Sequence, residues 1–597
     1  MTDTQLTGAE GIAWNLADLY TAIDDPAINA DLDHCDAEAA ALNQDYRGRV
    51  GTLSTAELAA LLTRFEALVE RSGRLGSYAG LHWSQNTEDA ARGALLQRIS
   101  ERGARISQEL VFLELELANA AEAQAARWLD DPALARWHHW LEMVRIFRPH
   151  LLSEAEEKLL TEKAVTGREA WGRFFEEAHG AMRYQLDGET LTRDQLLSKL
   201  YGGDRALRRR AAEALTAGLR PMQRTNAYIF NTLLADKASD DRLRGYASWI
   251  SARNLANEVG DAVVDTLVRS VTGRYDLVGR YYSLKRRLLG LDELTDYDRY
   301  APLPAADHTY TWETARSIVL EAYARFHPLL AETAGLFFTQ SWIDAPPRPG
   351  KSGGAFSHGT VPSAHPYILL NYEGHARDVM TLAHELGHGV HQKLSGIQGV
   401  LQADTPLTTA ETASVFGEML VFQDLMAKES DPAARLALLT AKIEDSIATA
   451  FRQVSMNRFE EAIHTARREE GELTVERFSE LWMETQRAMF GDSVTITENY
   501  SLWWSYVPHF ISTPGYVYAY AFGELLVLAL YARYQQQGAD FPARYLAMLS
   551  AGGSQWPHDL VRPLGVDLTD PQFWNNGLSL LEALIEQAET LAASIGF

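Results

Sequence analysis

Two histidines and a glutamate in the segment VMTLAHELGHGVHQKL have the types and the spacing of a catalytic metal site. His384 and His388 are four residues apart, so a helix places both imidazoles on one face, where they can bind one ion. Glu385 lies beside them and offers a carboxylate that can act as general base on a metal-bound water. This HExxH pattern predicts a zinc site with His384 and His388 as ligands and Glu385 as a catalytic residue.

A catalytic zinc ion needs a third protein ligand, because three protein ligands leave the fourth position open. Metzincins supply it within the same motif, but here His391 and Leu394 occupy the positions of their glycine and histidine, which excludes that pattern. The first glutamate after the motif is Glu411, in TPLTTAETASVFGEML, close to a predicted helix start. We predict Glu411 as the third ligand, and Asp404 in the preceding loop is the alternative.

Two further side chains near the motif have predicted supporting roles. Glu418 lies seven residues after Glu411, on almost the same helix face, and can accept the outer N–H of a zinc-bound histidine. His391 shares a helix face with His388 and could be a ligand, but a hydrogen-bonded core histidine is favoured.

The segment YSLWWSYVPHFISTPGYVYAYAFGELL contains neutral donors suited to the oxyanion of an attacked carbonyl group. These donors are His509, Tyr516, Tyr518 and Tyr520, and Tyr516 and Tyr520 share a helix face. The alternative is an aromatic core patch whose hydroxyl groups are already hydrogen-bonded. The sequence does not determine which tyrosine donates.

Composition excludes several classes of partner. The 597 residues carry 55 Lys and Arg against 80 Asp and Glu, a formal charge of −25, which disfavours nucleic acid and anionic membranes. The single cysteine, Cys35, permits no internal disulfide and fits a reducing cytoplasm. The start has no signal-peptide pattern, and the most apolar segment, 516–532, is interrupted by Gly523 and Glu524. We expect a cytoplasmic protein with no membrane or nucleic-acid partner.

Hydrophobic periodicity predicts a mainly helical chain, for example over residues 56–70 and 91–119. Asp187-Gly188 between alternating side chains predicts a β-hairpin, and residues 342–374, rich in Pro, Gly and short apolar runs, predict a small β-sheet beside the HExxH helix. The predicted organisation is an N-terminal helical lobe at 1–180, a hairpin and linker at 181–200, and a catalytic domain at 201–597.

Several separated segments together resemble the M3 family of metallopeptidases, specifically the oligoendopeptidase F group, which is related to thimet oligopeptidase and neurolysin. These segments are AHELGHGVH (383–391), TPLTTAETASVFGE (405–418), PYILLNYEG (366–374), GAFSHG (354–359) and HFISTPGYVYAYAFG (509–523). Fainter similarity in WNLADLY and EKAVTGREAW extends the resemblance over nearly the whole chain.

The resemblance implies a mainly α, two-lobed body with a deep substrate channel, one zinc ion at its floor, and cleavage of short peptides rather than folded proteins. The family's zinc ligands match His384, His388 and Glu411, its general base matches Glu385, and its transition-state donors match His509, Tyr516 and Tyr520. Its strand before the catalytic helix lies along the substrate, which implies that residues 365–372 pair with the peptide backbone. The expected substrate-binding residues are His365 and Tyr367 in this strand, and Tyr518 in the segment that follows Gly515.

The function predicted from these features is zinc-dependent endopeptidase activity on short oligopeptides. One alternative is an exopeptidase, such as a carboxypeptidase or dipeptidyl carboxypeptidase, which needs a group that anchors a substrate terminus. A second is a helical peptide-binding protein in which zinc is structural or absent. The sequence does not indicate the oligomeric state or the cleavage-site preference.

Overall fold

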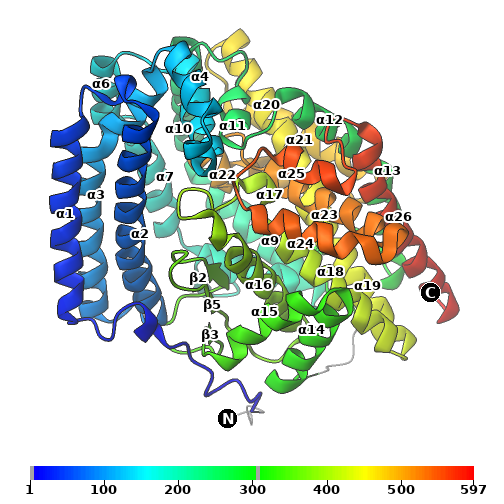
Figure 1. The fold of residues 1–597 in the computed structure, drawn as a ribbon. Coiled ribbons are helices and arrows are strands. Elements are labelled where there is room, and N and C mark those ends of the chain that lie inside the picture. The colour runs from blue at the N-terminus through cyan, green and yellow to red at the C-terminus, as the bar shows by residue number, and fades with distance from the viewer. Residues whose placement is uncertain (1–5, 304–308) are drawn as a thin grey trace. The chain divides into compact units, whose positions relative to one another are not determined.

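The computed structural model describes residues 6–303 and 309–597, which form helices and two small sheets (Figure 1). The predicted mainly α fold is confirmed. Contacts divide the chain into two compact units. The first takes in the described parts of Met1–Arg148, Asp307–Lys428 and Arg533–Asp567, and the second those of Pro149–Ala306, Glu429–Ala532 and Leu568–Phe597. These units interleave along the chain, whereas the predicted lobes follow one another in sequence.

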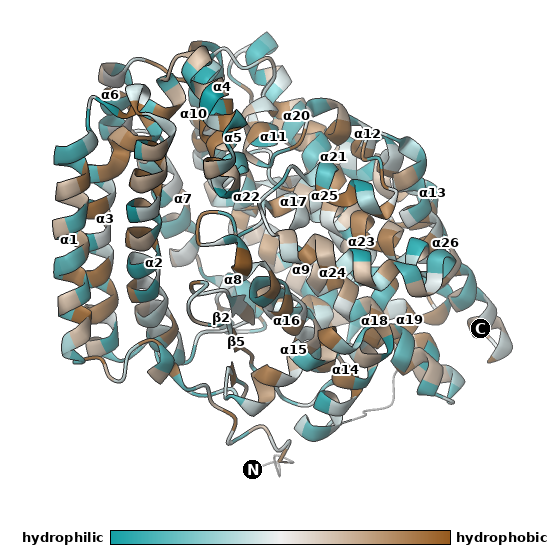
Figure 2. Ribbon diagram, in the orientation of Figure 1, coloured by the Kyte–Doolittle hydropathy of each residue, from teal (hydrophilic) through white to brown (hydrophobic). Residues whose placement is uncertain are grey.

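The first unit holds the HExxH motif. Its helices are α1 (Pro26–Tyr46), α2 (Thr55–Gln85), α3 (Ala90–Asn119), α4 (Glu122–Asp130), α5 (His138–Ile146), α14 (Trp312–Phe326), α15 (Pro328–Thr339), α16 (Ala376–Ser395), α17 (Leu407–Ala410), α18 (Thr412–Lys428), α24 (Phe541–Ala551) and α25 (Pro557–Val561). The helices predicted at 56–70 and 91–119 are confirmed as α2 and α3, which pack with α1 (Figure 1). Apolar and polar residues alternate along these three helices (Figure 2), as expected for amphipathic helices that bury one face.

The second unit contains the segment with His509. Its helices are α6 (Glu154–Ala164), α7 (Arg168–Ala181), α8 (Arg193–Ser198), α9 (Arg205–Leu219), α10 (Gln223–Arg244), α11 (Ser251–Ala256), α12 (Asp261–Thr272), α13 (Tyr275–Leu288), α19 (Pro432–Ser446), α20 (Gln453–Glu470), α21 (Val475–Phe490), α22 (His509–Ser512) and α26 (Pro571–Ser594). A π-helical turn at Ile447–Arg452 joins α19 to α20. Helix α23 (Tyr518–Gln537) starts in the second unit and ends in the first.

The predicted hairpin is confirmed in the second unit. Strands β1 (Tyr184–Leu186) and β2 (Glu189–Leu191) are antiparallel. Asp187 and Gly188 between them have φ of 50° and 90°, the left-handed conformations that a two-residue hairpin turn requires.

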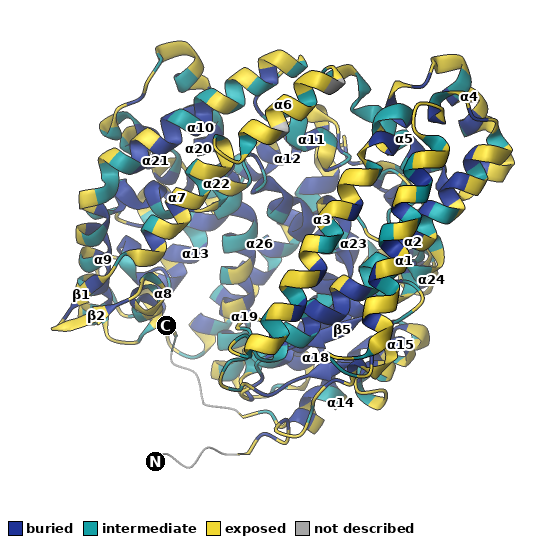
Figure 3. Cartoon of the chain, turned by 90° about the vertical axis from the view of Figure 1, so that its left-hand side faces the viewer, coloured by how far each residue is buried: buried dark blue, intermediate teal, exposed yellow. Residues whose placement is uncertain are grey.

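The predicted sheet beside the HExxH helix is also confirmed, in the first unit. It consists of β3 (Ile343–Asp344), β4 (Phe356–His358) and β5 (Tyr367–Leu369) in the order β3-β5-β4. β5 is the central strand, parallel to β3 and antiparallel to β4, and all of its residues are buried (Figure 3). β4 is half-buried, and both β4 and β5 pack against α16.

Helices α16 and α18 approach each other closely because glycines lie at their interface. A side chain at Gly387 would come within 2.6 Å of Ser414 Cα and would also meet the carbonyl oxygen of Ala413. A side chain at Gly417 would meet Ala383 O and the hydroxyl of Tyr323, which donates a 2.6 Å hydrogen bond to that same carbonyl oxygen. The glycine inside the HExxH motif therefore allows the backbone that follows Glu411 to lie against the catalytic helix.

Replacing Gly387 with Ala is expected to lower the free energy of unfolding by about 1–3 kcal/mol, because the new methyl group overlaps the α18 backbone, which cannot move aside cheaply. Thermal and urea unfolding measure the change. Gly335→Ala in α15 is the matched control, since nothing lies within 4 Å of its added methyl group. Equal stability of the two variants would contradict this account of the interface.

None of the helices in the described ranges combines the length and the apolar character that a bilayer-spanning segment needs.

Candidate metal centre

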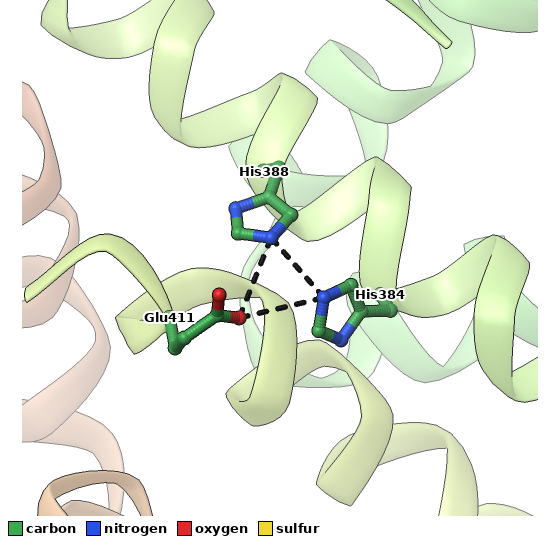
Figure 4. Close-up of side chains that lie close together, drawn as sticks. All are labelled: His384, His388 and Glu411. Atoms are coloured by element: carbon green, nitrogen blue, oxygen red, sulfur yellow. Dashed lines mark hydrogen bonds and ion pairs between the residues drawn. The ribbon is translucent and has the colours of Figure 1, made fainter. Parts of the chain in front are cut away.

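His384, His388 and Glu411 come together in the first unit with their ligand atoms facing one point (Figure 4). The two histidine Nε2 atoms are 3.1 Å apart, and each lies 3.4 Å from Glu411 Oε2. Ligand atoms about 2.0–2.2 Å from one ion, at tetrahedral angles, are about 3.3–3.6 Å apart. The three side chains thus have the spacing of three corners of a tetrahedral site whose fourth position is left for water or substrate.

Glu411 reaches this position from a break between two helices. It follows α17, with φ of −82° and ψ of 1°, and directly precedes α18. Ser414 Oγ, in the first turn of α18, donates a 2.7 Å hydrogen bond to Glu411 Oε2. Burial alone would raise the pKa of Glu411, but the hydrogen bond from His388 and the nearby imidazoles lower it to about 2. Glu411 is therefore an anion over the physiological pH range, as a metal ligand must be.

Glu418 orients the first histidine, as the sequence predicts. His384 Nδ1 lies 2.5 Å from Glu418 Oε1, so the outer nitrogen is the donor and Nε2 faces the cluster. Burial lowers the pKa of His384, but the hydrogen bond to Glu418 and the charges of Glu418 and Glu411 raise it to about 9. A metal ion would replace the Nε2 proton of this imidazole.

Glu385 is buried, with 6% of its surface exposed. Burial raises its pKa, and the two histidines partly offset that shift. It belongs to the wall of the cavity that the ligand histidines line and is absent from the three-residue ligand cluster. This placement suits a base that acts on a bound molecule rather than a ligand.

A cavity of about 540 Å³ adjoins the cluster within the first unit. It is lined by Ala355, Phe356, Ser357, His384, Glu385, His388, His391, Gln392, Ser395, Ala403, Asp404, Thr405 and Ala410. The edge strand β4 thus lies along the same cavity as the ligands.

The two alternative ligands weighed from the sequence lie outside the three-residue cluster. Asp404 lines the cavity but is not among the grouped ligand atoms. His391 is 7% exposed, and burial lowers its pKa to about 4, so it is a neutral, largely buried histidine in the cavity wall.

The predicted oxyanion donors gather in the second unit. His509 Nε2 lies 3.3 Å from the hydroxyl oxygen of Tyr520, and the rings of His509 and Tyr516 are parallel at 6.1 Å. All three side chains are half-buried. Tyr518 is separate from them, because it is fully buried and its hydroxyl accepts a 2.9 Å hydrogen bond from Asn257.

The predicted pairing of residues 365–372 with substrate requires correction. β5 is bonded on both edges, to β3 and to β4, so its backbone cannot add another strand. The side chains are engaged as well: His365 is buried against Trp342 at 3.9 Å and bound to Asp18, and the hydroxyl of the fully buried Tyr367 donates to Asn15 O. These residues support the sheet.

Sequence reasoning assigned no role to β4 or to Ser414. The segment GAFSHG contains β4, but its position at the sheet edge depends on strand order, which no local pattern encodes. Ser414 follows Glu411 by three residues. At the start of a helix this spacing allows the Ser414 hydroxyl to hydrogen-bond with the Glu411 side chain.

An HExxH helix joined to a carboxylate that directly precedes a second helix, on a mainly α scaffold, defines a metallopeptidase. Comparison with known families agrees: the profile of Peptidase family M3 matches residues 199–580, and that of Oligopeptidase F matches residues 116–184. The chain belongs to peptidase family M3.

Relatives and solved structures extend this likeness over the whole chain. The chain is 28% identical to oligopeptidase PepF of Bacillus subtilis, over 98% of this chain and 87% of the relative. It is 29% identical to group B oligopeptidase PepB of Streptococcus agalactiae, over 88% of each. A crystal structure of a candidate peptidase from Chlamydophila abortus has a TM-score of 0.88 at 25% identity and covers 98% of this chain and 100% of that one. Oligoendopeptidase-F from Enterococcus faecium shares the fold, with a TM-score of 0.70 at 22% identity and coverage of 95% and 98%.

Proposed function

We propose that this metallopeptidase is a zinc endopeptidase that hydrolyses internal bonds of short oligopeptides. The observation that carries the proposal is the near-tetrahedral spacing of His384, His388 and Glu411, with the buried Glu385 beside them. The names of the relatives, oligopeptidase and oligoendopeptidase, support peptides as the substrate class.

His384, His388 and Glu411 fit one zinc ion, since two imidazoles and one carboxylate are a ligand set that catalytic zinc commonly has. When bound, zinc would supply a Lewis acid that lowers the pKa of a water molecule toward ~7 and polarises the substrate carbonyl group. Glu418 would hold His384 in the tautomer that keeps Nε2 free for the ion.

Glu385 is the proposed general base. Its carboxylate takes a proton from the attacking water and then delivers it to the leaving amine, which completes hydrolysis of the peptide bond. His509 and a tyrosine, either Tyr516 or Tyr520, are the proposed donors to the oxyanion, and each well-placed donor contributes about 3 kcal/mol to transition-state stabilisation.

β4 is the proposed place where substrate backbone pairs by strand addition. Among the described residues β4 pairs as a strand only with β5, so its other edge has no strand partner. Gln392 Nε2 donates a 3.3 Å hydrogen bond to Ser357 O of this strand, and an added strand would displace that contact. Phe356 and Ser357 of this strand line the cavity that also contains His384 and Glu385.

The predicted deep channel, the domain boundaries and the cytoplasmic location stay predictions.

Hydrolysis of an internally quenched peptide that is acetylated and amidated at its ends tests the proposal. We expect the purified protein to contain about one zinc per chain and to cleave this peptide, and we expect 1,10-phenanthroline to abolish cleavage and added zinc to restore it. Cleavage restricted to uncapped peptides would identify an exopeptidase. Peptide binding without cleavage would identify a binding protein, and either result would overturn the endopeptidase proposal.

A further inference from the structure

Asp404 places a carboxylate in the wall of the cavity beside the metal centre. It is exposed and lines this cavity of about 540 Å³ together with His384, Glu385 and His388, all within the first unit. Across residues 6–303 and 309–597, no hydrogen bond or ion pair engages its side chain, and it is absent from the ligand cluster. A carboxylate has two acceptor oxygens, so Asp404 can bind a donor that enters the cavity.

The backbone around Asp404 is held in place by contacts of its own loop. Gln402 is 4% exposed, and its side chain accepts a 3.0 Å hydrogen bond from Trp140 N and donates one of 2.5 Å to Arg136 O. Gly553 N, just after α24, donates to Gln402 O at 2.9 Å, and a side chain at Gly553 would collide with Asp404 O. A fixed backbone that carries an unbonded carboxylate is a preorganised acceptor, which reduces the entropy lost on binding.

Other polar groups of the cavity wall are occupied or uncharged. Ser357 Oγ donates a 2.8 Å hydrogen bond to Gln392 Oε1, and Gln392 Nε2 donates to Ser357 O. His391 is neutral, because burial lowers its pKa to about 4. Among the described residues that line the cavity, none is Lys or Arg. The carboxylates of the wall are Glu385, which is the proposed base, and Asp404, which has no partner in the wall.

An imidazole on β4 feels the charge of Asp404 without neutralising it. Burial lowers the pKa of His358, the last residue of β4, and the negative charge of Asp404 only partly offsets that shift. His358 is therefore uncharged near neutral pH, and its Nδ1 accepts a 3.0 Å hydrogen bond from Thr360 N. The negative charge of Asp404 is thus left for a group that enters the cavity from outside the protein.

We propose that Asp404 binds a cationic group of the peptide substrate and so favours peptides with a basic group near the cleaved bond. This inference rests on the proposed function, in which Glu385 on the wall of the same cavity acts on the attacking water. Hydrogen bonds between a carboxylate and a guanidinium or ammonium group are about twice as strong as neutral ones. The cation is an Arg or Lys side chain or the N-terminal ammonium group. The net charge of −25 would also attract such peptides from a distance.

Internally quenched peptides of one sequence test the inference. The reference peptide has Gln at the positions that flank the cleaved pair of residues, and both of its ends are capped. In each further peptide one Gln becomes Arg, and a last peptide keeps every Gln but has a free N-terminus. The readout is the kcat/KM of each cationic peptide divided by that of the reference, with the cleaved bond identified by mass spectrometry. We expect wild type to prefer a cationic peptide and Asp404→Asn to lower that ratio by about 5- to 30-fold, mainly through KM.

Asp130→Asn in α4 is the matched control, because Asp130 is an exposed aspartate of the same unit that does not line the cavity. It should keep the wild-type ratio. Asp404→Lys is a second variant that reverses the charge, and it should prefer Glu over Gln at the position where wild type prefers Arg. A preference confined to Arg peptides identifies a side chain as the cation, and one confined to the free N-terminus identifies the ammonium group.

A wild-type ratio near one for every cationic peptide would overturn the inference, and so would equal losses for cationic and reference peptides in Asp404→Asn. Loss of zinc from Asp404→Asn would also overturn it, because Asp404 would then act on the metal rather than on the substrate. Cleavage of the capped reference peptide by wild type is a separate readout, so failure of this inference is distinguishable from failure of the proposed function.

Discussion

Replacement of Glu385 by Gln is expected to lower kcat by about 10²–10⁴-fold while the protein still binds zinc. Gln has nearly the shape of Glu, so it can fill the same 6% exposed position without disturbing the helix. Its amide cannot accept and return a proton, which removes the general base from both steps of hydrolysis. Steady-state kinetics on the capped peptide and zinc analysis by mass spectrometry measure the two effects.

Glu332→Gln provides the control for this prediction, because Glu332 is an exposed glutamate on α15 of the same unit. It should leave kcat and zinc content as in wild type. Turnover by Glu385→Gln within about threefold of wild type would contradict the assignment of the base, and loss of zinc would show instead that Glu385 supports the ion.

Replacement of Glu411 by Ala is expected to weaken zinc binding more than about 100-fold. Losing a residue that is hydrogen-bonded to a ligand typically costs about 10–100-fold in metal affinity, and losing a ligand itself should cost more. The variant keeps both histidines but loses the carboxylate that is grouped with them among the described residues. Zinc competition against a chelator of known affinity measures the change, and activity should fall in parallel at limiting zinc.

Asp404→Ala is the matched control for the third ligand. Asp404 lines the same cavity and was the alternative ligand in the sequence, but its carboxylate is not grouped with the histidines. We expect this variant to keep the zinc affinity of wild type. The opposite pattern, with zinc lost from Asp404→Ala and kept by Glu411→Ala, would exchange the two assignments.

The part of the site on one helix could be predicted from the sequence because its geometry is local. Residues four apart on a helix share a face, so His384 and His388 had to converge if α16 formed. Glu418 could be placed from Glu411 by the same periodicity. The identity of Glu411 as the third residue depended on a tertiary contact, the close approach of α18 to α16 at Gly387, which no spacing in the sequence specifies.

The order of strands and the course of the chain between units could not be predicted, because both depend on nonlocal pairing. The family resemblance correctly implied a strand within residues 365–372, but an apolar strand is equally consistent with an edge or a centre. The structure places it in the centre and gives the edge to β4. The three tyrosines after Gly515 are likewise equivalent as candidate donors in the sequence. In the structure Tyr518 differs from the other two because it is buried and its hydroxyl is hydrogen-bonded to Asn257.

The location of the bound metal tests the central claim most directly. Diffraction data collected on either side of the zinc absorption edge, from crystals of the wild-type protein grown without added metal, would show any zinc as an anomalous peak. The account predicts one peak per chain, about 2.0–2.2 Å from His384 Nε2, His388 Nε2 and a Glu411 oxygen. A peak at other residues, or none beside these three in active protein, would contradict it.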